Sequence, residues 1–319
     1  MSNGHLRAPS LVEILVLIPT YILVGYSECI STILSLIWWE RSPALTAALI
    51  GLHSLLVIMA MWAHWMSLFT DPGQVPAFDD EAMAEDALRW GFTKCTKCDS
   101  IRPKRTYHCK VCRRCILHMD HHCPWIGNCV GLFNQKFFIQ YNVYVFLVGM
   151  SDLGIGSSIV YKVYENVSMS PQTLSQKYGM GLIICTVIFF MLAVIFTIFT
   201  LNVLFDQIRG LYRNQTTIDR LKGISTREQT LLQSAINVFG GPPSMKWLLP
   251  IRMKPKYLGA SLSAADVVAI SILDEREAHM FDGNEELQCI ELAANAQGRR
   301  HRLKTLNSGK AETETEVIV

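Results

Sequence analysis

Apolar residues along this chain gather in four long runs that polar segments separate. The runs cover Leu11–Ile37, Ala44–Phe69, Phe137–Tyr161 and Met180–Phe205. Each run is apolar on every side of a helix rather than along one stripe. Each also exceeds the roughly 20 residues that a helix needs to cross a bilayer. The pattern therefore predicts an all-α membrane protein with four transmembrane helices.

The polar segments between and after the runs predict further divisions of the chain. The expected parts are transmembrane helices 1 and 2 in 1–70, a cysteine-rich segment in 71–135 (core 92–132), transmembrane helices 3 and 4 in 136–206, a membrane-associated segment in 207–259, and a mostly disordered tail in 260–319. The first run is too long for a signal peptide and has only Arg7 before it. We therefore expect this run to be retained as a transmembrane helix.

The distribution of charge predicts how the chain crosses the membrane. Mean hydropathy is +0.24 and the net charge is +2, so neither number indicates a charged partner such as a nucleic acid. The only basic residue in the loop between runs one and two is Arg41. The only basic residues in the loop between runs three and four are Lys162 and Lys177. The segment between runs two and three is rich in Lys and Arg, as is the region after run four. The positive-inside rule places both termini and the cysteine-rich segment in the cytosol.

The most informative segment lies between Cys95 and Cys129, which holds seven of the ten cysteines and four of the nine histidines. Its short Cys-x-x-Cys steps have the spacing of structural zinc sites, which take four Cys or His ligands each. Cytosolic thiols stay reduced, so clustered cysteines indicate metal ligands or nucleophiles rather than disulfides. Two zinc ions need eight ligands, and the segment offers eleven candidates.

The surplus leaves two interpretations open. Seven cysteines and one histidine also make eight ligands, in which case the segment is a zinc scaffold or a ubiquitin-ligase-like binding module without catalysis. The alternative uses Asp120, His121 and Cys123 for chemistry. A thiol with a pKa near 8.5 is mostly protonated in the cytosol, so it needs an imidazole to accept its proton and a carboxylate to orient that imidazole. A transporter is a third, weaker interpretation.

Asp120-His121-His122-Cys123 within this cysteine-rich frame resembles the DHHC-type protein S-acyltransferases, or palmitoyltransferases. The resemblance covers most of the chain, including the four apolar runs. Further motif matches are Asp71-Pro72-Gly73 after run two, Thr216-Thr217-Ile218-Asp219 after run four, and Asn237 with Phe239-Gly240 in the C-terminal region. The family's Thr-Thr-x-Glu ends here in Asp219, which shortens the side chain by one methylene and leaves its partner unknown.

The resemblance implies a role for each residue of the segment. One zinc ion is implied for Cys95, Cys98, His108 and Cys115, and a second for Cys109, Cys112, His122 and Cys129. Cys123 is implied to be the nucleophile, His121 the base and Asp120 the group that orients it. Thr217 is expected to form a hydrogen bond with Asp120.

The implied reaction is the two-step transfer of an acyl group from palmitoyl-CoA to cysteines of membrane-associated proteins. We expect Trp125 to line the mouth of an acyl cavity and Val148 to lie near its floor. Many family members are found in the Golgi or the endoplasmic reticulum, so we expect one of these membranes, with the plasma membrane as the alternative. Two further expectations are a PDZ partner for the C-terminal Glu316-Val317-Ile318-Val319 and a glycosylation site at Asn166 in the lumenal loop.

Overall fold

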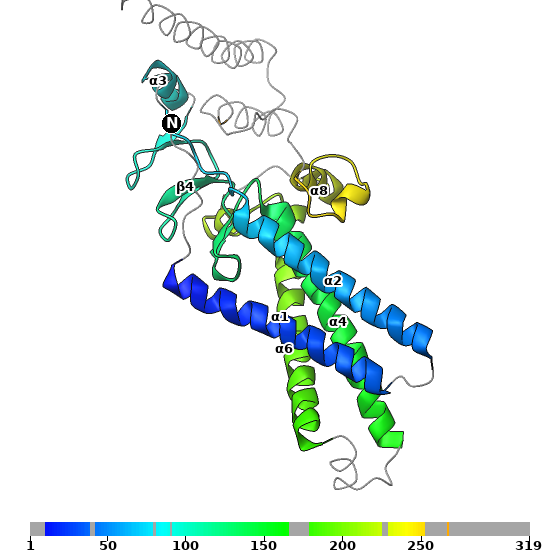
Figure 1. The fold of residues 1–319 in the computed structure, drawn as a ribbon. Coiled ribbons are helices and arrows are strands. Elements are labelled where there is room, and N and C mark those ends of the chain that lie inside the picture. Colours follow the sequence, from blue (N-terminus) through cyan, green and yellow to red (C-terminus); the bar gives the residue numbers. More distant parts are fainter. Residues whose placement is uncertain are drawn as a thin grey trace, which may run out of the picture.

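The computed structural model describes residues 10–38, 42–78, 81–89, 91–165, 179–224, 229–252 and 267. Within these residues, four helices are long and apolar enough to cross a membrane, namely α1 (Leu11–Trp38), α2 (Pro43–Phe69), α4 (Gln135–Glu165) and α6 (Met180–Tyr212). They lie side by side as a bundle (Figure 1). The prediction of a four-span membrane protein is confirmed. Asn166 and the C-terminal residues fall outside the described residues.

The end of α2 explains the Asp-Pro-Gly motif. The side chain of Asp71 accepts hydrogen bonds from the backbone amides of Gly73 (2.8 Å) and Gln74 (2.7 Å), which forms a turn directly after the helix. Gly73 has a φ of +108°, a conformation that disfavours side chains. The motif therefore redirects the chain from the membrane helix into the cysteine-rich segment.

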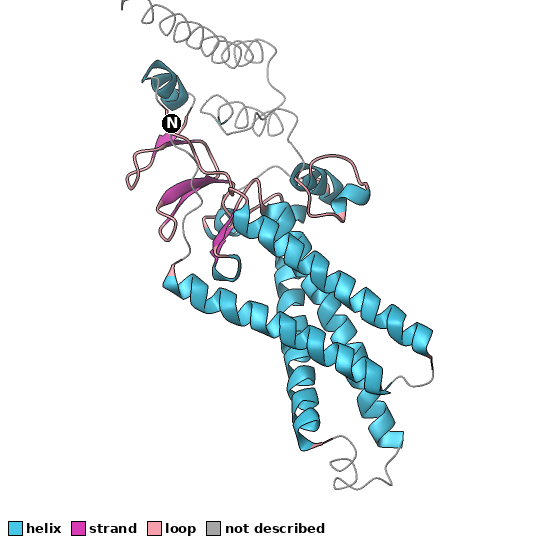
Figure 2. Ribbon diagram, viewed as in Figure 1, coloured by secondary structure: helices cyan, strands magenta, loops and turns pink. Residues whose placement is uncertain are grey.

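The cysteine-rich segment is built of short hairpins, which lie beyond one end of the bundle (Figure 2). After α3 (Glu81–Arg89) come three two-stranded antiparallel sheets. They pair β1 (Thr93–Lys94) with β2 (Ile101–Arg102), β3 (Thr106–Cys109) with β4 (Arg114–Leu117), and β5 (His121–Cys123) with β6 (Asn128–Val130). The helical class thus describes the membrane part, whereas the segment between α2 and α4 owes its shape to tight turns.

Two asparagines attach this segment to the C-terminal end of α2. The side-chain amide of Asn128 donates to the carbonyl oxygens of Leu68 (3.1 Å) and Thr70 (3.0 Å), and that of Asn134 donates to Ser67 (3.2 Å). The last carbonyls of a helix have no partner within the helix, so these bonds satisfy groups that would otherwise be buried without one. Strand β6 is thereby fixed against the membrane helix.

The segment that follows α6 contains α7 (Thr217–Leu221), α8 (Leu231–Phe239) and a 3-10 turn η2 (Met245–Trp247). Leu221 is exposed on α7, and Leu231 and Leu232 are exposed on α8. The start of α4 holds the end of the segment, because Gln140 donates to the carbonyls of Trp247 (2.7 Å) and Leu249 (3.0 Å).

Candidate active site and metal centres

Eight of the cysteines and histidines form two groups of four, each with its ligand atoms within 4.8 Å of one another. The groups are Cys95, Cys98, His108 and Cys115, and Cys109, Cys112, His122 and Cys129. These are the two sets that the family resemblance implies. All nine cysteines in the described part of the chain are free thiols. Three thiols and one imidazole are a usual ligand set for structural zinc, so both groups fit that ion.

Hairpin pairing explains how each group forms. In the register of β3 and β4, His108 lies opposite Cys115, and in that of β5 and β6, His122 lies opposite Cys129. The Cys-x-x-Cys turns then bring the remaining thiols alongside, with 3.5 Å between the sulfurs of Cys98 and Cys115. Each ion would therefore link two neighbouring hairpins that are too small to be stable alone.

One residue of the second metal group has a partner that the sequence did not indicate. Nε2 of His122 lies 3.0 Å from a carboxylate oxygen of Glu13, while its Nδ1 faces the sulfurs of Cys112 (3.4 Å) and Cys129 (3.6 Å). Glu13 comes from the first turn of α1 and is only 2% exposed. A carboxylate on the outer nitrogen of a ligating histidine fixes the ring's tautomer and orientation.

Cys123 belongs to neither metal group and lies instead beside His121 at the end of β5. Nδ1 of His121 is 2.8 Å from Oδ2 of Asp120. Burial lowers the pKa of His121, but the hydrogen bonds to Asp120 and to Cys123 outweigh it and raise the pKa to about 9. Burial alone would raise the pKa of Asp120, yet its partners, chiefly His121, lower it to about 2. The imidazole of His121 thus lies between the thiol of Cys123 and the ionised carboxylate of Asp120.

Two further donors, 87 and 97 positions later in the chain, hold Asp120. The backbone amide of Thr217 donates to Oδ1 at 2.6 Å, and the side-chain amide of Gln207 donates to Oδ2 at 2.9 Å. The expected bond between Thr217 and Asp120 is therefore present through the backbone. Gln207 was not anticipated, since a single amide at the end of an apolar run carries no pattern. It reaches the site because α6 continues seven residues beyond the predicted Phe205, to Tyr212.

The Thr-Thr-x-Asp motif positions Thr217. Asp219 accepts from the backbone amide of Thr216 (3.0 Å) while its own amide donates to the Thr216 hydroxyl (3.1 Å), which makes a capping box at the start of α7. Asp219 is fully buried and also accepts from Arg105 (3.0 Å) and Tyr107 (2.7 Å). The partners of Asp219 that the sequence left unknown are thus in the cysteine-rich segment, and they bring α7 against it.

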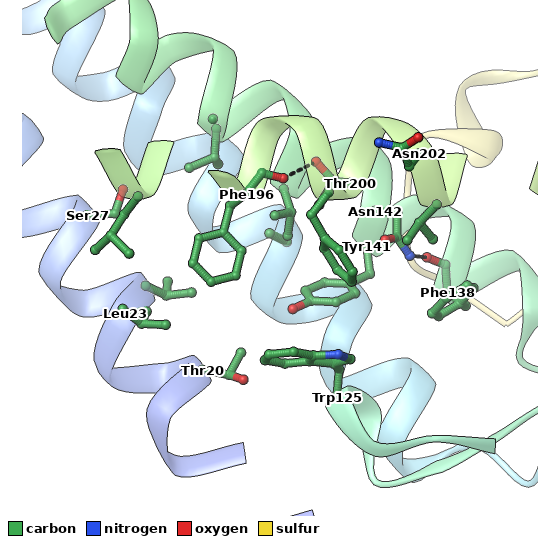
Figure 3. A pocket seen from close by; sticks show the side chains of 18 of the residues that line it. Thr20, Leu23, Ser27, Trp125, Phe138, Tyr141, Asn142, Phe196, Thr200 and Asn202 are labelled. Atoms are coloured by element: carbon green, nitrogen blue, oxygen red, sulfur yellow. Dashed lines mark hydrogen bonds between the residues drawn. The ribbon is translucent and has the colours of Figure 1, made fainter. Parts of the chain in front are cut away.

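A cavity of about 540 Å³ opens beside Cys123 and extends among the four helices. Its lining includes Cys123, His121, Trp125 and Val148. Figure 3 shows Trp125 and Tyr141 facing Leu23 and Thr20 of α1 across this space, with Phe196 of α6 deeper in the bundle. Most of the lining is apolar. The volume lies within the range of about 300–1,000 Å³ usual for pockets that bind small molecules.

One motif residue lies away from this arrangement. Asn237 is exposed on α8 and donates to Gln229 within its own segment, at 3.5 Å. Asp71, Pro72 and Gly73 act through the turn after α2 rather than through the cavity. Among the motif residues, Thr216, Thr217 and Asp219 therefore support the site directly.

Known proteins with similar sequences are palmitoyltransferases or protein S-acyltransferases by name. The family model "DHHC palmitoyltransferase" matches residues 91–224. The chain is 32% identical to palmitoyltransferase ZDHHC7 of Mus musculus over 244 residues (72% of this chain and 76% of the relative). It is 33% identical to palmitoyltransferase ZDHHC3 of Homo sapiens over 245 residues (73% and 79%). It is also 32% identical to probable protein S-acyltransferase 12 of Arabidopsis thaliana over 252 residues (72% and 82%).

The fold and the site define a multi-pass membrane protein with a cysteine-rich module of two four-ligand metal groups and a thiol–imidazole–carboxylate series. The chain belongs to the DHHC palmitoyltransferase family, and is thus an acyltransferase. The resemblance inferred from the cysteine pattern is confirmed.

Proposed function

We propose that this protein is a protein S-palmitoyltransferase that moves a long-chain acyl group from acyl-CoA to cysteine thiols of substrate proteins through an acyl-enzyme on Cys123. One observation carries the proposal. Cys123 is outside both metal groups, lies beside the His121–Asp120 pair, and lines an apolar cavity inside the membrane bundle. A zinc scaffold would have no use for a free thiol at the mouth of such a cavity.

In the first step, His121 takes the proton of the Cys123 thiol, and the thiolate attacks the carbonyl carbon of the acyl-CoA thioester. The bond between that carbon and the CoA sulfur breaks, and the CoA thiolate takes the proton from His121. Asp120 stays ionised, with its pKa near 2, and stabilises the imidazolium that exists between the two proton transfers. The raised pKa of His121 favours this protonated intermediate.

In the second step, a thiol of the substrate protein gives its proton to His121 and attacks the acyl-enzyme. The bond between the acyl carbon and Cys123 breaks, and the Cys123 sulfur recovers a proton from His121. The same base therefore serves both halves of the reaction. The acyl chain stays in the cavity throughout, because its transfer to water would cost about 0.8 kcal/mol per methylene.

The two zinc ions supply folding free energy when bound, and no step of the transfer runs through them. In the second group, the ligands His122 and Cys129 fix β5 and β6 on either side of the turn that follows Cys123. The lysines and arginines of the module offer charge-assisted contacts for the phosphates of CoA. We place the module in the cytosol, as the charge distribution predicts, which restricts substrates to membrane-associated proteins with cytosolic cysteines. A Golgi or endoplasmic reticulum membrane is the proposed location.

The test is labelling of the purified protein with radioactive palmitoyl-CoA, followed by hydroxylamine, which cleaves thioesters. Wild type should take up a label that hydroxylamine removes, and Cys123→Ser should take up none while keeping two zinc ions. Cys29→Ser, which removes an exposed thiol of α1, is the matched control and should label like wild type. Labelling of Cys123→Ser would refute the acyl-enzyme. Loss of one zinc ion in that variant would make Cys123 a ligand and favour the scaffold.

A further inference from the structure

Three side chains of α1 and α2 form a series of hydrogen bonds that ends next to the nucleophile. Nε1 of Trp65 donates to the hydroxyl of Tyr21 at 2.9 Å, and that hydroxyl is 3.0 Å from Nδ1 of His64. Nε2 of His64 is 3.0 Å from the carbonyl oxygen of Trp125, two residues after Cys123. The series therefore runs from the side of α2 to the backbone of the active-site turn.

Only one arrangement of hydrogens satisfies every member of this series. An indole nitrogen can only donate and a backbone carbonyl can only accept. The Tyr21 oxygen accepts from Trp65, so its own hydrogen is free to point at Nδ1 of His64. The hydrogen of the neutral His64 ring is then on Nε2, where it donates to Trp125. Removing the Tyr21 hydroxyl would leave Nδ1 of His64 without the donor that completes this arrangement.

His64 is fully buried, and neither the metal groups nor the acid–base pair uses it. Its ring packs edge-on against Tyr21, at 5.4 Å between ring centroids, and against Tyr141, at 5.1 Å. A buried imidazole is costly unless both nitrogens are paired, and here both are. Tyr141 also lines the cavity, so the series adjoins the space proposed for the acyl chain.

The turn that receives this bond is tightly placed. Pro124–Ile126 form the 3-10 turn η1, which closes with a bond from the amide of Gly127 to the carbonyl of Pro124 at 3.2 Å. Gly127 has a φ of +58°, and a methyl group there would meet Leu17 of α1 and Leu68 of α2, both at 3.4 Å. Ile126 is fully buried. The turn thus packs between α1 and α2, and His64 contacts it at the Trp125 carbonyl.

We propose that His64 is a positioning residue, which holds the Cys123–Gly127 turn over the cavity through the Trp125 carbonyl and is itself oriented by Tyr21 and Trp65. The catalytic part of this inference rests on the proposed function, since it concerns the rate at which Cys123 becomes acylated. Displacement of a reacting group by about 1 Å can cost about 100-fold in rate. The anchoring of the turn can be measured without any acyl transfer.

The first experiment compares three variants of the full-length protein in single-turnover acylation by palmitoyl-CoA. His64→Leu should lower the acylation rate about 100-fold with two zinc ions retained and KM for palmitoyl-CoA little changed. His64→Gln should restore most of the rate, because its amide can donate to the Trp125 carbonyl. Tyr21→Phe keeps the ring contacts and should cost about 10-fold. Equal losses in His64→Leu and His64→Gln, or no loss in either, would overturn the proposal.

The second experiment measures alkylation of Cys123 by iodoacetamide, followed on the peptide that carries it. The alkylation rate should rise as the turn is released, in the order wild type, Tyr21→Phe, His64→Leu, with His64→Gln close to wild type. An unchanged rate in Tyr21→Phe and His64→Leu would refute the anchoring. Should His64→Leu fail to fold, Tyr21→Phe and His64→Gln decide by the same criteria. If the variants follow this order of alkylation rates but wild type takes up no acyl label, the anchoring stands and the proposed function fails.

Discussion

The backbone amide of Thr217 and the carboxylate of Asp120 are joined by a hydrogen bond of 2.6 Å across 97 positions of the chain. Gln207 donates to the other oxygen of the same carboxylate. The orientation of His121 therefore depends on residues that follow the fourth membrane helix or lie at its end. The His121–Asp120 pair precedes α4 in the chain, whereas the groups that hold Asp120 lie at the end of α6 and after it. The DHHC sequence alone therefore does not build the site.

Gln207→Leu should lower the rate of acylation about tenfold while both zinc ions stay bound. The change removes one donor from a buried carboxylate, and an unmade bond of this kind costs about 1–3 kcal/mol. Single-turnover labelling and zinc analysis on the same sample would measure it. Gln233→Leu, on the exposed side of α8, serves as control. An unaffected rate in Gln207→Leu would mean that the other partners of Asp120 suffice.

Cys98→Ser and Cys112→Ser should each lower zinc content and expression together. Each removes a thiolate from a group of four ligands whose metal supplies folding free energy. Zinc analysis and a thermal unfolding profile in detergent would be compared with those of Cys123→Ser. Full zinc content and unchanged unfolding in either ligand variant would show that the assigned ligand sets are wrong.

The two neighbouring histidines should give opposite phenotypes. His121→Ala should keep zinc and lose the acyl-enzyme, because it removes the proposed base and His121 belongs to neither metal group. His122→Ala should lose zinc and structure, since it removes a ligand of the second group. The measurements are zinc stoichiometry and hydroxylamine-sensitive label. Interchanged phenotypes would interchange the two roles.

Asp219→Leu should lower the free energy of unfolding by about 3–5 kcal/mol, because it leaves the largely buried Arg105 without its charged partner. The change would appear as a lower unfolding temperature in detergent. Glu85→Ala, which breaks an exposed pair with Arg89 on α3, should leave that temperature unchanged. A similar small effect in both variants would mean that the contact between α7 and the cysteine-rich segment adds little stability.

Val148→Phe should shift the preference toward shorter acyl-CoAs. Val148 is on α4 and lines the cavity, so a larger side chain there would fill space proposed for the acyl chain. Competition labelling with fourteen-, sixteen- and eighteen-carbon acyl-CoAs would measure the profile. Leu147→Phe, an exposed position one residue earlier, should not change it. A wild-type profile in a well-folded Val148→Phe would remove Val148 from the determinants of chain length.

The apolar runs and the cysteine spacing were sufficient to predict the four spans and the presence of a two-metal module. Such signals are local, because a membrane helix satisfies its own backbone and a Cys-x-x-Cys turn brings its own sulfurs together. One further partner each of Asp120, His122 and Asp219 was not predictable in the same way. Gln207, Glu13 and Arg105 are single residues whose meaning depends on where helices end and how they pack, and neither is encoded in a short pattern.

The two metal groups alternate along the chain, because Cys115 of the first group falls between Cys112 and His122 of the second. Tandem zinc fingers can be copied, removed or exchanged one at a time, because each closes on its own stretch of sequence. Here no stretch between Cys95 and Cys129 contains one complete site without cutting through the other. The module must therefore be gained, inherited or lost as a whole, and length changes within it are expected to disturb both sites at once.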